Sequence, residues 1–508
     1  MTELSTLTIP AVWRRVAQTR GSSTHLVLPD GQEVSYGETF LRARQLGRHL
    51  TDSGIRPGDR IVSLLGNGRE LYEFYVACGL AGAVAVPVNV MGTAREVLAL
   101  ATDCSAAGVV ARADLAGNAP EGLRLRLVVG GELDGWLPYE SALGEPGPEE
   151  APAAPGDPAV IIYSSGTTGL PKGIVLSHFG LVRNAQLTSQ ALGYTEDDTL
   201  LSVLPSYSSF GFSWDFLQLG LVGMRLVVLP AFSPDEALDL VQRHGVTSIA
   251  GVPTVFVRMF SEDRLHGRCL DSLRLLDVGG GPVPDLLKTR IRDRFGVDVV
   301  ESYGLSEISP VATVERVGHP TPPGSCGPPL PGIEVRVVDG DDQDVPTGET
   351  GELLFRSETV MLGYLNNPEE TAHTLRGGWL HSGDLGRVDD DGNVFIVDRI
   401  KELIVTSGYN VYPKEVESVL FSHPGVQSVA VVGLPDETRG DNVHAFVVAQ
   451  PGEQVSVEEL LVHARENLSL YKVPRGITLV DELPLTASGK IRKFRLVQQA
   501  TGPSGGTA

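Results

Sequence analysis

Cysteine is scarce in this chain, and its few occurrences form no recognisable framework. The four cysteines lie far apart, and none belongs to a C-x-x-C pair: Cys78, Cys104, Cys269 and Cys326. Small secreted domains and zinc sites depend on closely spaced cysteines. The spacing therefore excludes a disulfide framework and a zinc site of that kind, and it predicts a protein of the reducing cytoplasm.

Positive charge is also in short supply. The 508 residues include 41 Lys and Arg against 63 Asp and Glu, which gives a formal net charge of −22. Binding to nucleic acid or to an anionic membrane relies on basic surface, so neither is an expected partner. Only seven of the basic residues are lysines. Arginine supplies the ordinary surface charge here, which draws attention to the lysines in polar turns, Lys172 and Lys490.

Long hydrophobic runs are missing as well. The uncharged stretch 74–93 is nearly long enough to cross a bilayer, but Gly79, Gly82 and Pro87 interrupt it. We expect a buried helix, a turn and a strand there, and no membrane span. The first fifteen residues lack the basic-then-apolar order of a signal peptide.

The patterns that are present indicate an α/β protein of more than one domain. Strand-like apolar runs alternate with helix-like stretches, as in βα units with parallel sheets. After about residue 320, short strands with tight turns predict a small antiparallel β subdomain. Beyond Lys401 a further α+β pattern begins, and residues 498–508 are expected to form a disordered tail.

The segment YSSGTTGLPKG, residues 163–173, combines glycines, hydroxyls and a lysine directly after an apolar run. Such loops wrap backbone N–H groups and short hydroxyls around phosphate oxygens, and a lysine adds positive charge. The spacing differs from the G-x-x-x-x-G-K-[ST] of a Walker A loop, which excludes a generic P-loop ATPase. The candidate phosphate ligands are Ser164, Ser165, Gly166, Thr167, Thr168, Gly169 and Lys172.

The segment ESYGLSE, residues 301–307, places an aromatic ring, a glycine, hydroxyls and carboxylates within seven residues. Tyr303 can stack on a base, and Ser306 can hydrogen-bond a phosphate. Glu307 offers the carboxylate oxygens that Mg²⁺ prefers.

Two later motifs complete the set of polar candidates. In HSGDLG, Asp384 stands in a turn where its two oxygens can accept both hydroxyls of a ribose, and Arg399 follows fifteen residues later. In PLTASGKIRKF, Lys490 follows a glycine in a polar turn. Any one of these residues alone is typical of an ordinary turn, so only the combination points to a site.

The combination is also familiar as an ordered series: YSSGTTGLPKG, ESYGLSE, HSGDL, DRIKELI, SGYNVYPKEVE and LPLTASGKIRK. It resembles the adenylate-forming superfamily, which includes acyl- and aryl-CoA synthetases, adenylation domains of peptide synthetases and beetle luciferases. The likeness spans nearly the whole chain and is greatest to a stand-alone acyl-CoA synthetase. It implies a large N-terminal domain over 1–397, with its small β subdomain at about 320–397. A hinge at 398–401 and a small C-terminal domain over 402–497 that swivels about it would follow.

The resemblance also implies a role for each motif. Residues 164–172, with Lys172, would grip the β- and γ-phosphates of ATP, and Glu307 would bind Mg²⁺. Lys490 would bridge the acyl carboxylate and the α-phosphate, while Asp384 and Arg399 would hold the ribose. Residues 279–282 and 301–304 would frame the adenine and the acyl carboxylate, with Ser306 beside them: Gly281, Pro282, Glu301, Ser302, Tyr303 and Gly304.

A second set of residues would serve CoA. In this superfamily the C-terminal domain rotates between the two half-reactions, so Lys490 would withdraw as the domain turns about Lys401. The residues that would then line the pantetheine tunnel are Ser407, Gly408 and Tyr409.

The acyl pocket is assigned to a segment crowded with aromatic residues. Its candidate residues are Tyr207, Ser208, Phe210 and Gly211, together with Gly280. This crowding favours an apolar acid with ring or branched character. For Trp214 and Phe216, packing in the core beneath the pocket is at least as good an interpretation.

The chain departs from the superfamily pattern at several positions. Ser208 stands where many relatives have histidine, and Ser306 and Ser382 stand where threonine is usual. Ser302 replaces a frequent glycine, which should narrow that wall, and Gly281 replaces a frequent alanine, which should widen its own. One interpretation is a pocket adapted to an unusual acid; the other is a weakened adenylation half-reaction.

The sequence thus predicts a ligase that converts a hydrophobic carboxylic acid into acyl-AMP with ATP and Mg²⁺ and passes the acyl group to CoA. A homodimer is a candidate assembly. Two alternatives stay open: an enzyme that performs only thioester formation from acyl-adenylate made elsewhere, and a ligase that loads a carrier protein. No carrier domain is fused to the sequence, which favours CoA. A non-catalytic sensor would be expected to lack Lys490 or Glu307, and both are present.

Overall fold

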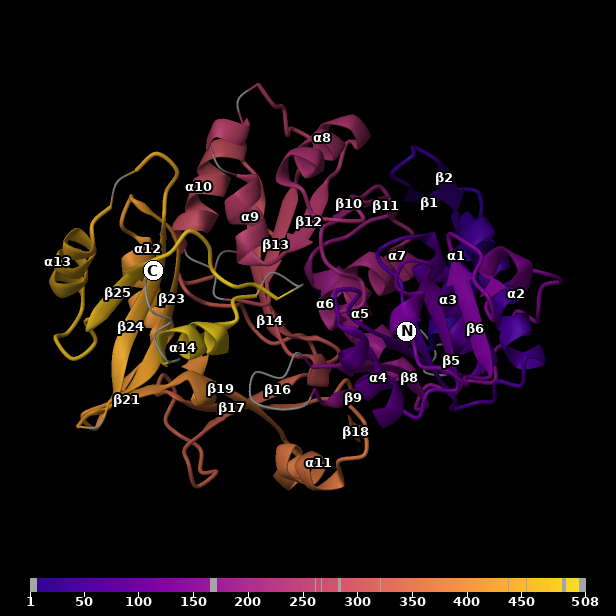
Figure 1. Ribbon diagram of the computed structural model, residues 1–508. Coiled ribbons are helices and arrows are strands. Elements are labelled where there is room, and N and C mark those ends of the chain that lie inside the picture. The colour runs from indigo at the N-terminus through magenta and orange to yellow at the C-terminus, as the bar shows by residue number, and fades with distance from the viewer. Residues whose placement is uncertain are drawn as a thin grey trace, which may run out of the picture.

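The computed structural model describes the chain from residue 7 to residue 501, apart from 165–170, 261, 266, 282–284, 320, 437, 454 and 487–489. Figure 1 shows the first elements of the chain on one side of the molecule and the last elements on the other. Two large sheets belong to the N-terminal part, and two smaller sheets follow.

The first large sheet has eight strands in the order β15-β14-β13-β12-β10-β11-β1-β2, parallel from β14 to β1 and antiparallel at both edges. Its strands are β1 (Thr24–Val27), β2 (Glu33–Ser35), β10 (Thr199–Ser202), β11 (Arg225–Val228), β12 (Ser248–Gly251), β13 (Leu275–Gly279), β14 (Asp298–Gly304) and β15 (Val311–Val314). The central strands are buried along almost their whole length. This burial explains why they read as short apolar runs without alternation.

The second large sheet has the order β18-β9-β8-β4-β3-β5-β6-β7 and is parallel from β8 to β7. Its strands are β3 (Arg60–Leu64), β4 (Val84–Pro87), β5 (Gly108–Arg112), β6 (Leu125–Val129), β7 (Leu137–Pro138), β8 (Pro158–Tyr163), β9 (Gly173–Ser177) and β18 (Gly363–Tyr364). Antiparallel β9 and β18 form one edge. The phosphate-loop segment therefore joins two neighbouring antiparallel strands, β8 and β9.

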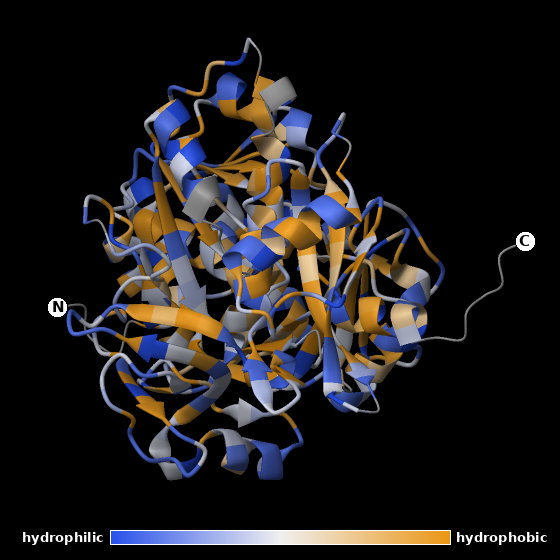
Figure 2. Cartoon of the chain, turned by 90° about the vertical axis from the view of Figure 1, so that its left-hand side faces the viewer, coloured by the Kyte–Doolittle hydropathy of each residue, from blue (hydrophilic) through white to orange (hydrophobic). Residues whose placement is uncertain are grey.

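Helices connect and cover these strands, as the βα rhythm of the sequence predicts. They are α1 (Ile9–Arg20), α2 (Tyr36–Asp52), α3 (Arg69–Ala81), α4 (Ala94–Asp103), α5 (His178–Ala191), α6 (Ser209–Phe212), α7 (Gln218–Val222), α8 (Pro234–His244), α9 (Pro253–Met259), α10 (Asp285–Phe295) and α11 (Pro368–Thr374). Figure 2 shows apolar residues concentrated on the interior strands and polar residues on the outer turns. The stretch 74–93 forms the end of α3, a left-handed turn at Gly82 (φ 70°) and β4, which confirms the expected helix, turn and strand.

An aromatic layer lies under the segment that sequence analysis assigned to the acyl pocket. Phe216 stacks on Trp13 of α1 with ring centroids 5.0 Å apart, and Tyr72 of α3 lies parallel to Phe216 at 6.3 Å. Phe216 and Trp214 are completely buried. Packing in the core is thus the observed state of both residues.

The small β subdomain is a four-stranded antiparallel sheet in the order β16-β17-β19-β20. Its strands are β16 (Glu334–Val338), β17 (Gly351–Arg356), β19 (Leu380–Val388) and β20 (Val394–Arg399). The short helical turn η8 (Ile400–Glu402) follows β20 and leads into the C-terminal part.

The C-terminal part is a five-stranded sheet with its own hydrophobic core. Its elements are β21 (Ile404–Thr406), β22 (Tyr409–Val411), α12 (Pro413–Phe421), β23 (Val426–Asp436), β24 (Gly440–Ala449), α13 (Val457–Asn467), β25 (Gly476–Leu479) and α14 (Lys493–Thr501). The predicted α/β class, with an antiparallel subdomain and a small α+β C-terminal part, is confirmed. The sequence predicts a disordered tail from residue 498. In the structure, α14 continues to Thr501, and Leu496 of this helix is buried.

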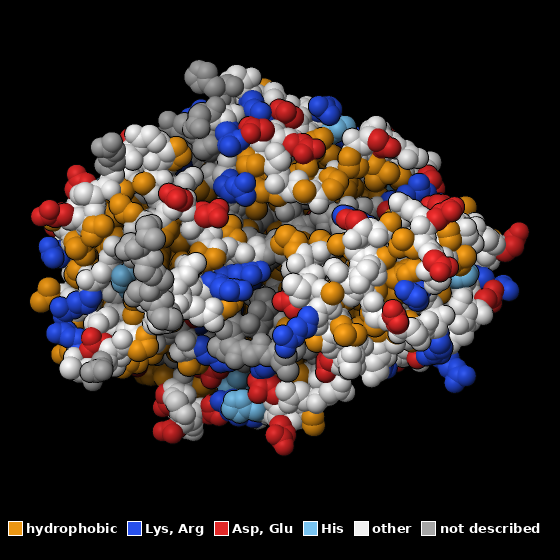
Figure 3. Space-filling model, in the orientation of Figure 1, with side chains coloured by type: hydrophobic (Ala, Val, Ile, Leu, Met, Phe, Trp, Pro, Cys, Tyr) orange, Lys and Arg blue, Asp and Glu red, His pale blue; other side chains and the backbone are white. Residues whose placement is uncertain are grey.

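Two surface properties bear on partners. In the described part of the chain, no helix is both long and apolar enough to cross a membrane. On the face drawn in Figure 3, acidic and basic side chains are interspersed and do not form one extended basic field.

Candidate active site

The candidate site lies at the carboxyl ends of β13 and β14, where the first large sheet meets the antiparallel subdomain. Parallel pairing sets Gly279 beside Ser302 and brings the two glycine-rich strand ends together. Gly304 must remain a glycine, because a Cβ there would lie 1.9 Å from the carbonyl oxygen of Pro310. The carboxyl ends of parallel strands are where α/β proteins usually bind ligands.

A carboxylate, a phenol and a guanidinium meet at the edge of this site. The hydroxyl of Tyr303 donates to Asp384 Oδ2 at 2.6 Å, and Arg399 Nε lies 3.2 Å from Asp384 Oδ1. Asp384 and Arg399 are direct partners in the β19–β20 ladder. Burial raises the pKa of Asp384, and the charge of Arg399 opposes that shift. The antiparallel register therefore explains the fifteen-residue spacing between Asp384 and Arg399.

The sequence predicts a turn at Asp384, but the structure places this residue within β19, and the neighbouring strand β17 holds that part of β19 in position. Glu352 of β17 accepts the backbone N–H of Gly383 at 3.0 Å and contacts His381 Nδ1 at 3.2 Å. The hydroxyl of Ser382 donates to the carbonyl of Leu353 at 2.6 Å. Serine at position 382, where threonine is usual in the resembling superfamily, thus keeps a hydroxyl hydrogen bond between β19 and β17.

Lys490 reaches this site from the far end of the chain. Its Cε and Nζ lie 3.4 and 3.8 Å from the position that a Cβ would take at Gly280. The residue as a whole is exposed, but its ammonium group is crowded by protein atoms. That burial and the nearby Arg399 lower the pKa of Lys490 to about 8, while the charges of Asp384 and Glu307 oppose the shift. The structure therefore brings Lys490 together with four of the other predicted site residues: Gly280, Asp384, Glu307 and Arg399.

Glu307 and Lys172 are linked through Tyr364, which sequence analysis did not single out. The Tyr364 hydroxyl donates to Glu307 Oε1 at 2.8 Å, and Lys172 Nζ lies 4.9 Å from the centroid of the Tyr364 ring. Lys172 also forms an ion pair with Glu370 of α11. No ion pair of Glu307 occurs among the residues that the structure describes. One carboxylate oxygen of Glu307 therefore accepts from Tyr364, and the other is unpaired within those residues.

The phosphate-loop segment is closed at its base. Ser164 N–H donates to the Lys172 carbonyl at 3.0 Å, and Lys172 N–H donates to Ser164 Oγ at 3.2 Å. The other predicted ligands in this loop, and Pro282, lie outside the described residues: Ser165, Gly166, Thr167, Thr168 and Gly169. Gly281 is described and exposed beside Pro253.

Two residues of the ESYG motif have partners other than those the resemblance implies. Glu301 is buried and pairs with Lys288 Nζ at 3.2 Å, and Cys326 Sγ lies 3.3 Å from its other oxygen. Ser302 donates to the buried Asp277 at 2.8 Å. Sequence analysis did not identify Asp277. The available signal was a carboxylate inside the apolar run LRLLDVG.

The segment assigned to the acyl pocket begins with a capped helical turn. Ser208 accepts the N–H of Gly211 at 3.2 Å and donates to the Pro205 carbonyl at 2.8 Å. Gly211 is required by close packing, because a Cβ there would lie 2.4 Å from the same carbonyl oxygen. Burial raises the pKa of Tyr207 to about 12. Phe210 is half-buried and meets Trp214 edge to face with ring centroids 4.6 Å apart.

This segment also touches the motif that carries Glu307. The hydroxyls of Ser209 and Ser306 are 2.7 Å apart. Serine at position 306 thus retains a hydroxyl contact, and the contact joins α6 to the end of β14. The pairing couples the position of the acyl segment to that of the ESYGLSE motif.

The residues assigned to the hinge and to the CoA tunnel lie in η8 and at the turn between β21 and β22. Lys401 is exposed in η8. Ser407 (φ 50°) and Gly408 (φ 82°) form the two-residue turn between β21 and β22, and Tyr409 stacks on Tyr471 at 4.8 Å. β21 lies between β22 and β24 in the C-terminal sheet, and Figure 1 shows it away from β13 and β14.

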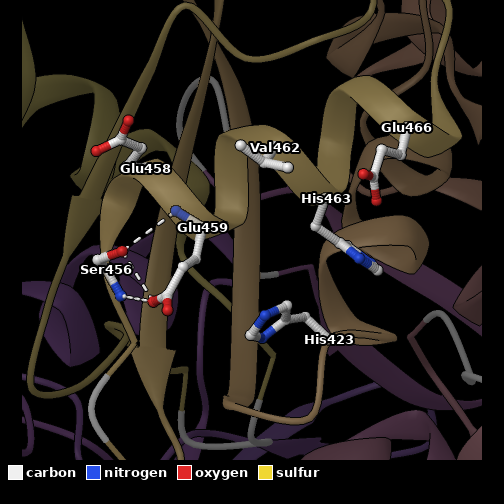
Figure 4. Close-up of a pocket in the computed structure, with 7 residues that line it drawn as sticks. All are labelled: His423, Ser456, Glu458, Glu459, Val462, His463 and Glu466. Atoms are coloured by element: carbon white, nitrogen blue, oxygen red, sulfur yellow. Dashed lines mark hydrogen bonds between the residues drawn. The ribbon is translucent and has the colours of Figure 1, made fainter.

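A surface hollow of about 540 Å³ also lies in the C-terminal part, between α12 and α13 (Figure 4). His463 Nε2 contacts Ser422 Oγ at 2.9 Å, and Glu459 caps α13 through Ser456. None of the predicted site residues lines this hollow. Its polar groups serve local structure.

Known families and proteins resemble the chain over nearly its full length. AMP-binding enzymes match residues 13–365, and the C-terminal domain of AMP-binding enzymes matches residues 415–490. A feruloyl-CoA synthase from an Amycolatopsis species is 36% identical over 466 residues, which cover 91% of this chain and 93% of that protein. The fatty acid–[acyl-carrier-protein] ligase ScoC of Streptomyces coeruleorubidus is 34% identical over 495 residues, which cover 95% and 94%.

Solved structures agree in fold. The anthranilate CoA ligase AuaEII in complex with anthranoyl-AMP superposes with a TM-score of 0.90 at 30% identity, covering 97% of both chains. ATP-bound MatB from Rhodopseudomonas palustris superposes with a TM-score of 0.89 at 30% identity, covering 97% of this chain and 99% of that one.

Proposed function

Because this chain belongs to the AMP-binding enzyme family and is an AMP-forming acid–thiol ligase, we propose that it joins a hydrophobic carboxylic acid to CoA in two steps. The first step uses ATP and Mg²⁺ to form acyl-AMP and pyrophosphate. The second step transfers the acyl group to the thiol of CoA and releases AMP.

The observation that carries the proposal is the position of Lys490. Its ammonium lies against Gly280 and within electrostatic reach of Asp384, Glu307 and Arg399. A carboxylate that attacks a triphosphate brings like charges together, so a positioned cation is needed where that charge develops. We assign Lys490 to the acyl carboxylate and the α-phosphate.

The atoms balance in both steps. In the first, a carboxylate oxygen bonds to the α-phosphorus, and the bond from that phosphorus to the bridging oxygen of pyrophosphate breaks. In the second, the thiol sulfur bonds to the acyl carbon, its proton is lost, and AMP leaves with the electron pair of the C–O bond. Lys490 stabilises charge in the first step without itself transferring a proton.

The remaining polar residues supply binding. We assign Asp384, supported by Tyr303 and Arg399, to the ribose hydroxyls and Lys172 to the outer phosphates. Gly281, which is exposed beyond the end of β13, leaves room there for the adenine and the acyl group.

The environment of Glu307 fits a magnesium ion. Tyr364 fixes one carboxylate oxygen, and the other is unpaired within the described residues. Hard oxygen ligands of this kind suit Mg²⁺, which would neutralise phosphate charge when bound.

We further propose that residues 402–497 swivel about 398–401 between the steps. Lys490 belongs to the moving part, so it would leave the site and the turn Ser407–Tyr409 would approach it. The separation of that turn from β13 and β14 in the present structure fits the orientation needed for the first step.

A carrier protein is the second candidate acceptor, because one relative is a fatty acid–[acyl-carrier-protein] ligase. CoA is preferred, since CoA ligases predominate among the relatives reported above. An enzyme confined to thioester formation is less well supported, because Ser306 and Ser382 both keep their hydroxyl contacts.

A split assay tests the proposal over a panel of hydrophobic, aromatic and polycyclic acids. One arm measures acid-dependent ATP–pyrophosphate exchange, and the other measures acyl-CoA formation from supplied acyl-adenylate. We expect both activities with the same acid. Thioester formation without exchange would establish the single-step alternative. Exchange without acyl-CoA formation would indicate a carrier protein as the acceptor. The absence of both activities would contradict the proposal.

A further inference from the structure

Asp277 is a buried carboxylate whose hydrogen bonding is incomplete. It lies on β13 and has no exposed surface. Its Oδ1 accepts from Ser302 Oγ at 2.8 Å, but its Oδ2 has no hydrogen-bond partner among the residues that the structure describes. No ion pair of Asp277 occurs within the described part of the chain. Burial raises the pKa of this carboxyl to about 7. Such an unsatisfied buried group needs an explanation, and functional sites are a common one.

The free oxygen belongs to the face of β13 that the acyl segment covers. Side chains alternate along a strand, so Asp277 and Gly279 point to the same face. Gly279 pairs with Ser302 across the parallel ladder, and a Cβ at Gly279 would lie 3.5 Å from Phe210 Cζ. Phe210 is one of the residues assigned to the acyl pocket. Asp277, Ser302 and Phe210 therefore lie on one side of the sheet.

Ser302 stands between Asp277 and the open end of the strands. It is 8% exposed, whereas Asp277 is 0% exposed. Gly280, which is exposed, follows Gly279 and lies against the Lys490 ammonium. A series of neighbouring residues thus connects Gly280, beside which the acyl carboxylate would react, through Gly279 and Ser302 to Asp277.

The spacing sets a length for the acid. Gly280 is three positions beyond Asp277, which corresponds to about 10 Å of extended chain at roughly 3.3 Å per residue. A hydrogen bond at each end occupies part of that length. The remainder corresponds to an acid built on one ring or on a chain of similar reach.

We propose that Asp277 and Ser302 form the end wall of the acyl site and recognise a hydrogen-bond donor, a hydroxyl or an amino group, at the end of the acid remote from its carboxylate. The inference rests on the proposed function and specifies its substrate. When Asp277 is ionised, the wall offers acceptors: the free oxygen of Asp277 and the lone pairs of Ser302, whose own proton is used toward Asp277. An acid that ends in a methyl group would leave these acceptors buried and unpaired. Sites built around such acceptors discriminate strongly against ligands that lack the donor.

A substrate pair and a residue pair test this wall. The substrates are ring acids that carry a remote hydroxyl or amino group and their methyl isosteres, compared by kcat/KM in ATP–pyrophosphate exchange. The variant is Asp277→Asn. The matched control is Asp215→Asn, because Asp215 is also buried and accepts from the hydroxyls of Ser202 (2.7 Å) and Ser206 (3.0 Å).

We expect the wild-type chain to favour a donor-bearing acid over its isostere by about 100-fold or more. Asp277→Asn should reduce that ratio at least about tenfold, and Asp215→Asn should leave it unchanged. If Asp277→Asn does not fold, as judged by its thermal melt, Ser302→Gly addresses the same wall and should also reduce the ratio. The separate hydroxyl and amino arms identify the donor.

The outcomes separate this inference from the proposed function. Wild-type exchange with a ratio near one, or a ratio that neither Asp277→Asn nor Ser302→Gly alters, would overturn the end wall while leaving the ligase intact. Absence of exchange and of acyl-CoA formation with every acid would overturn both.

Discussion

Lys490 allows the two half-reactions to be separated by a single substitution. Because its ammonium lies at the strand ends in the present orientation, we expect Lys490→Met to slow ATP–pyrophosphate exchange by about 10²–10³-fold, the usual effect of losing one charge-stabilising group. Acyl-CoA formation from supplied acyl-adenylate should change less than about threefold, since the first step needs the lysine and the second does not. Both rates are measured on the same preparation.

The matched control is Lys472→Met. This lysine is also in the C-terminal part, but it pairs with Glu415 on the surface at 2.6 Å. Neither half-reaction should respond to its loss. Equal slowing of both steps in Lys490→Met would contradict the role assigned to Lys490.

The lowered pKa of Lys490 also predicts a pH dependence. Burial and Arg399 bring the pKa to about 8, so the free enzyme loses the ammonium as pH rises through that value. We expect kcat/KM for exchange to fall above about pH 8, because this parameter reports ionisations of the free enzyme. Arginine stays protonated, so Lys490→Arg should remove the alkaline fall even if it is slower overall. Persistence of the same fall in Lys490→Arg would assign it to another group.

At the scale of elements, β18 links the phosphate loop to the metal candidate through Tyr364. Tyr364→Phe removes the 2.8 Å hydrogen bond to Glu307 and keeps the ring beneath Lys172. Loss of a group that orients a metal ligand typically weakens metal binding by 10–100-fold. We therefore expect the Mg²⁺ concentration for half-maximal exchange to rise about tenfold, with near-normal rates at saturating Mg²⁺.

Tyr471→Phe serves as the control, since Tyr471 stacks on Tyr409 in the C-terminal sheet. Its magnesium requirement should match that of the wild type. A rate loss in Tyr364→Phe that high magnesium does not restore would argue against the link to Glu307.

The elements also show what the sequence could and could not predict. Strand-and-helix rhythm is sufficient to predict the sheets. The turn expected at Asp384 is wrong, because this residue lies within β19 and pairs with Arg399 of β20. The partners of the motif residues were not predictable in the same way. Asp277 and Tyr364 lie outside the motifs that carry the resemblance. Tyr303 contacts Asp384, which lies 81 residues away in the sequence. Such contacts depend on strand register and on how separate sheets pack, which residue types alone do not specify.

For the whole molecule, Lys414 fastens the C-terminal part to the antiparallel subdomain. Its Nζ donates to the Ile396 carbonyl at 2.9 Å, and its N–H donates to Asp398 at 3.0 Å. The proposed swivel would separate these groups. Lys414→Met removes a charged hydrogen bond of about 1.5 kcal/mol and should shift the ratio of thioester formation to adenylation upward by about tenfold.

The ratio is obtained from single-turnover measurements of each step. Lys472→Met is again the control, because its partner Glu415 lies on α12 and moves with it. An unchanged ratio in Lys414→Met would mean that this contact does not govern the orientation of the C-terminal part.

The ion pair between Lys172 and Glu370 has a consequence for turnover. If Lys172 binds the outer phosphates as proposed, an arriving triphosphate must displace Glu370 from the lysine, and Glu370 then competes with the substrate for that charge. The same carboxylate can recapture Lys172 once pyrophosphate has formed. The ion pair with Glu370 would thus weaken the binding of ATP and speed the release of pyrophosphate, because both depend on which group holds Lys172. Glu370→Gln is therefore expected to lower KM for ATP and to slow pyrophosphate release in a stopped-flow assay, and an opposite change in either would exclude this competition. Glu370 would then shorten the time for which pyrophosphate stays bound to Lys172.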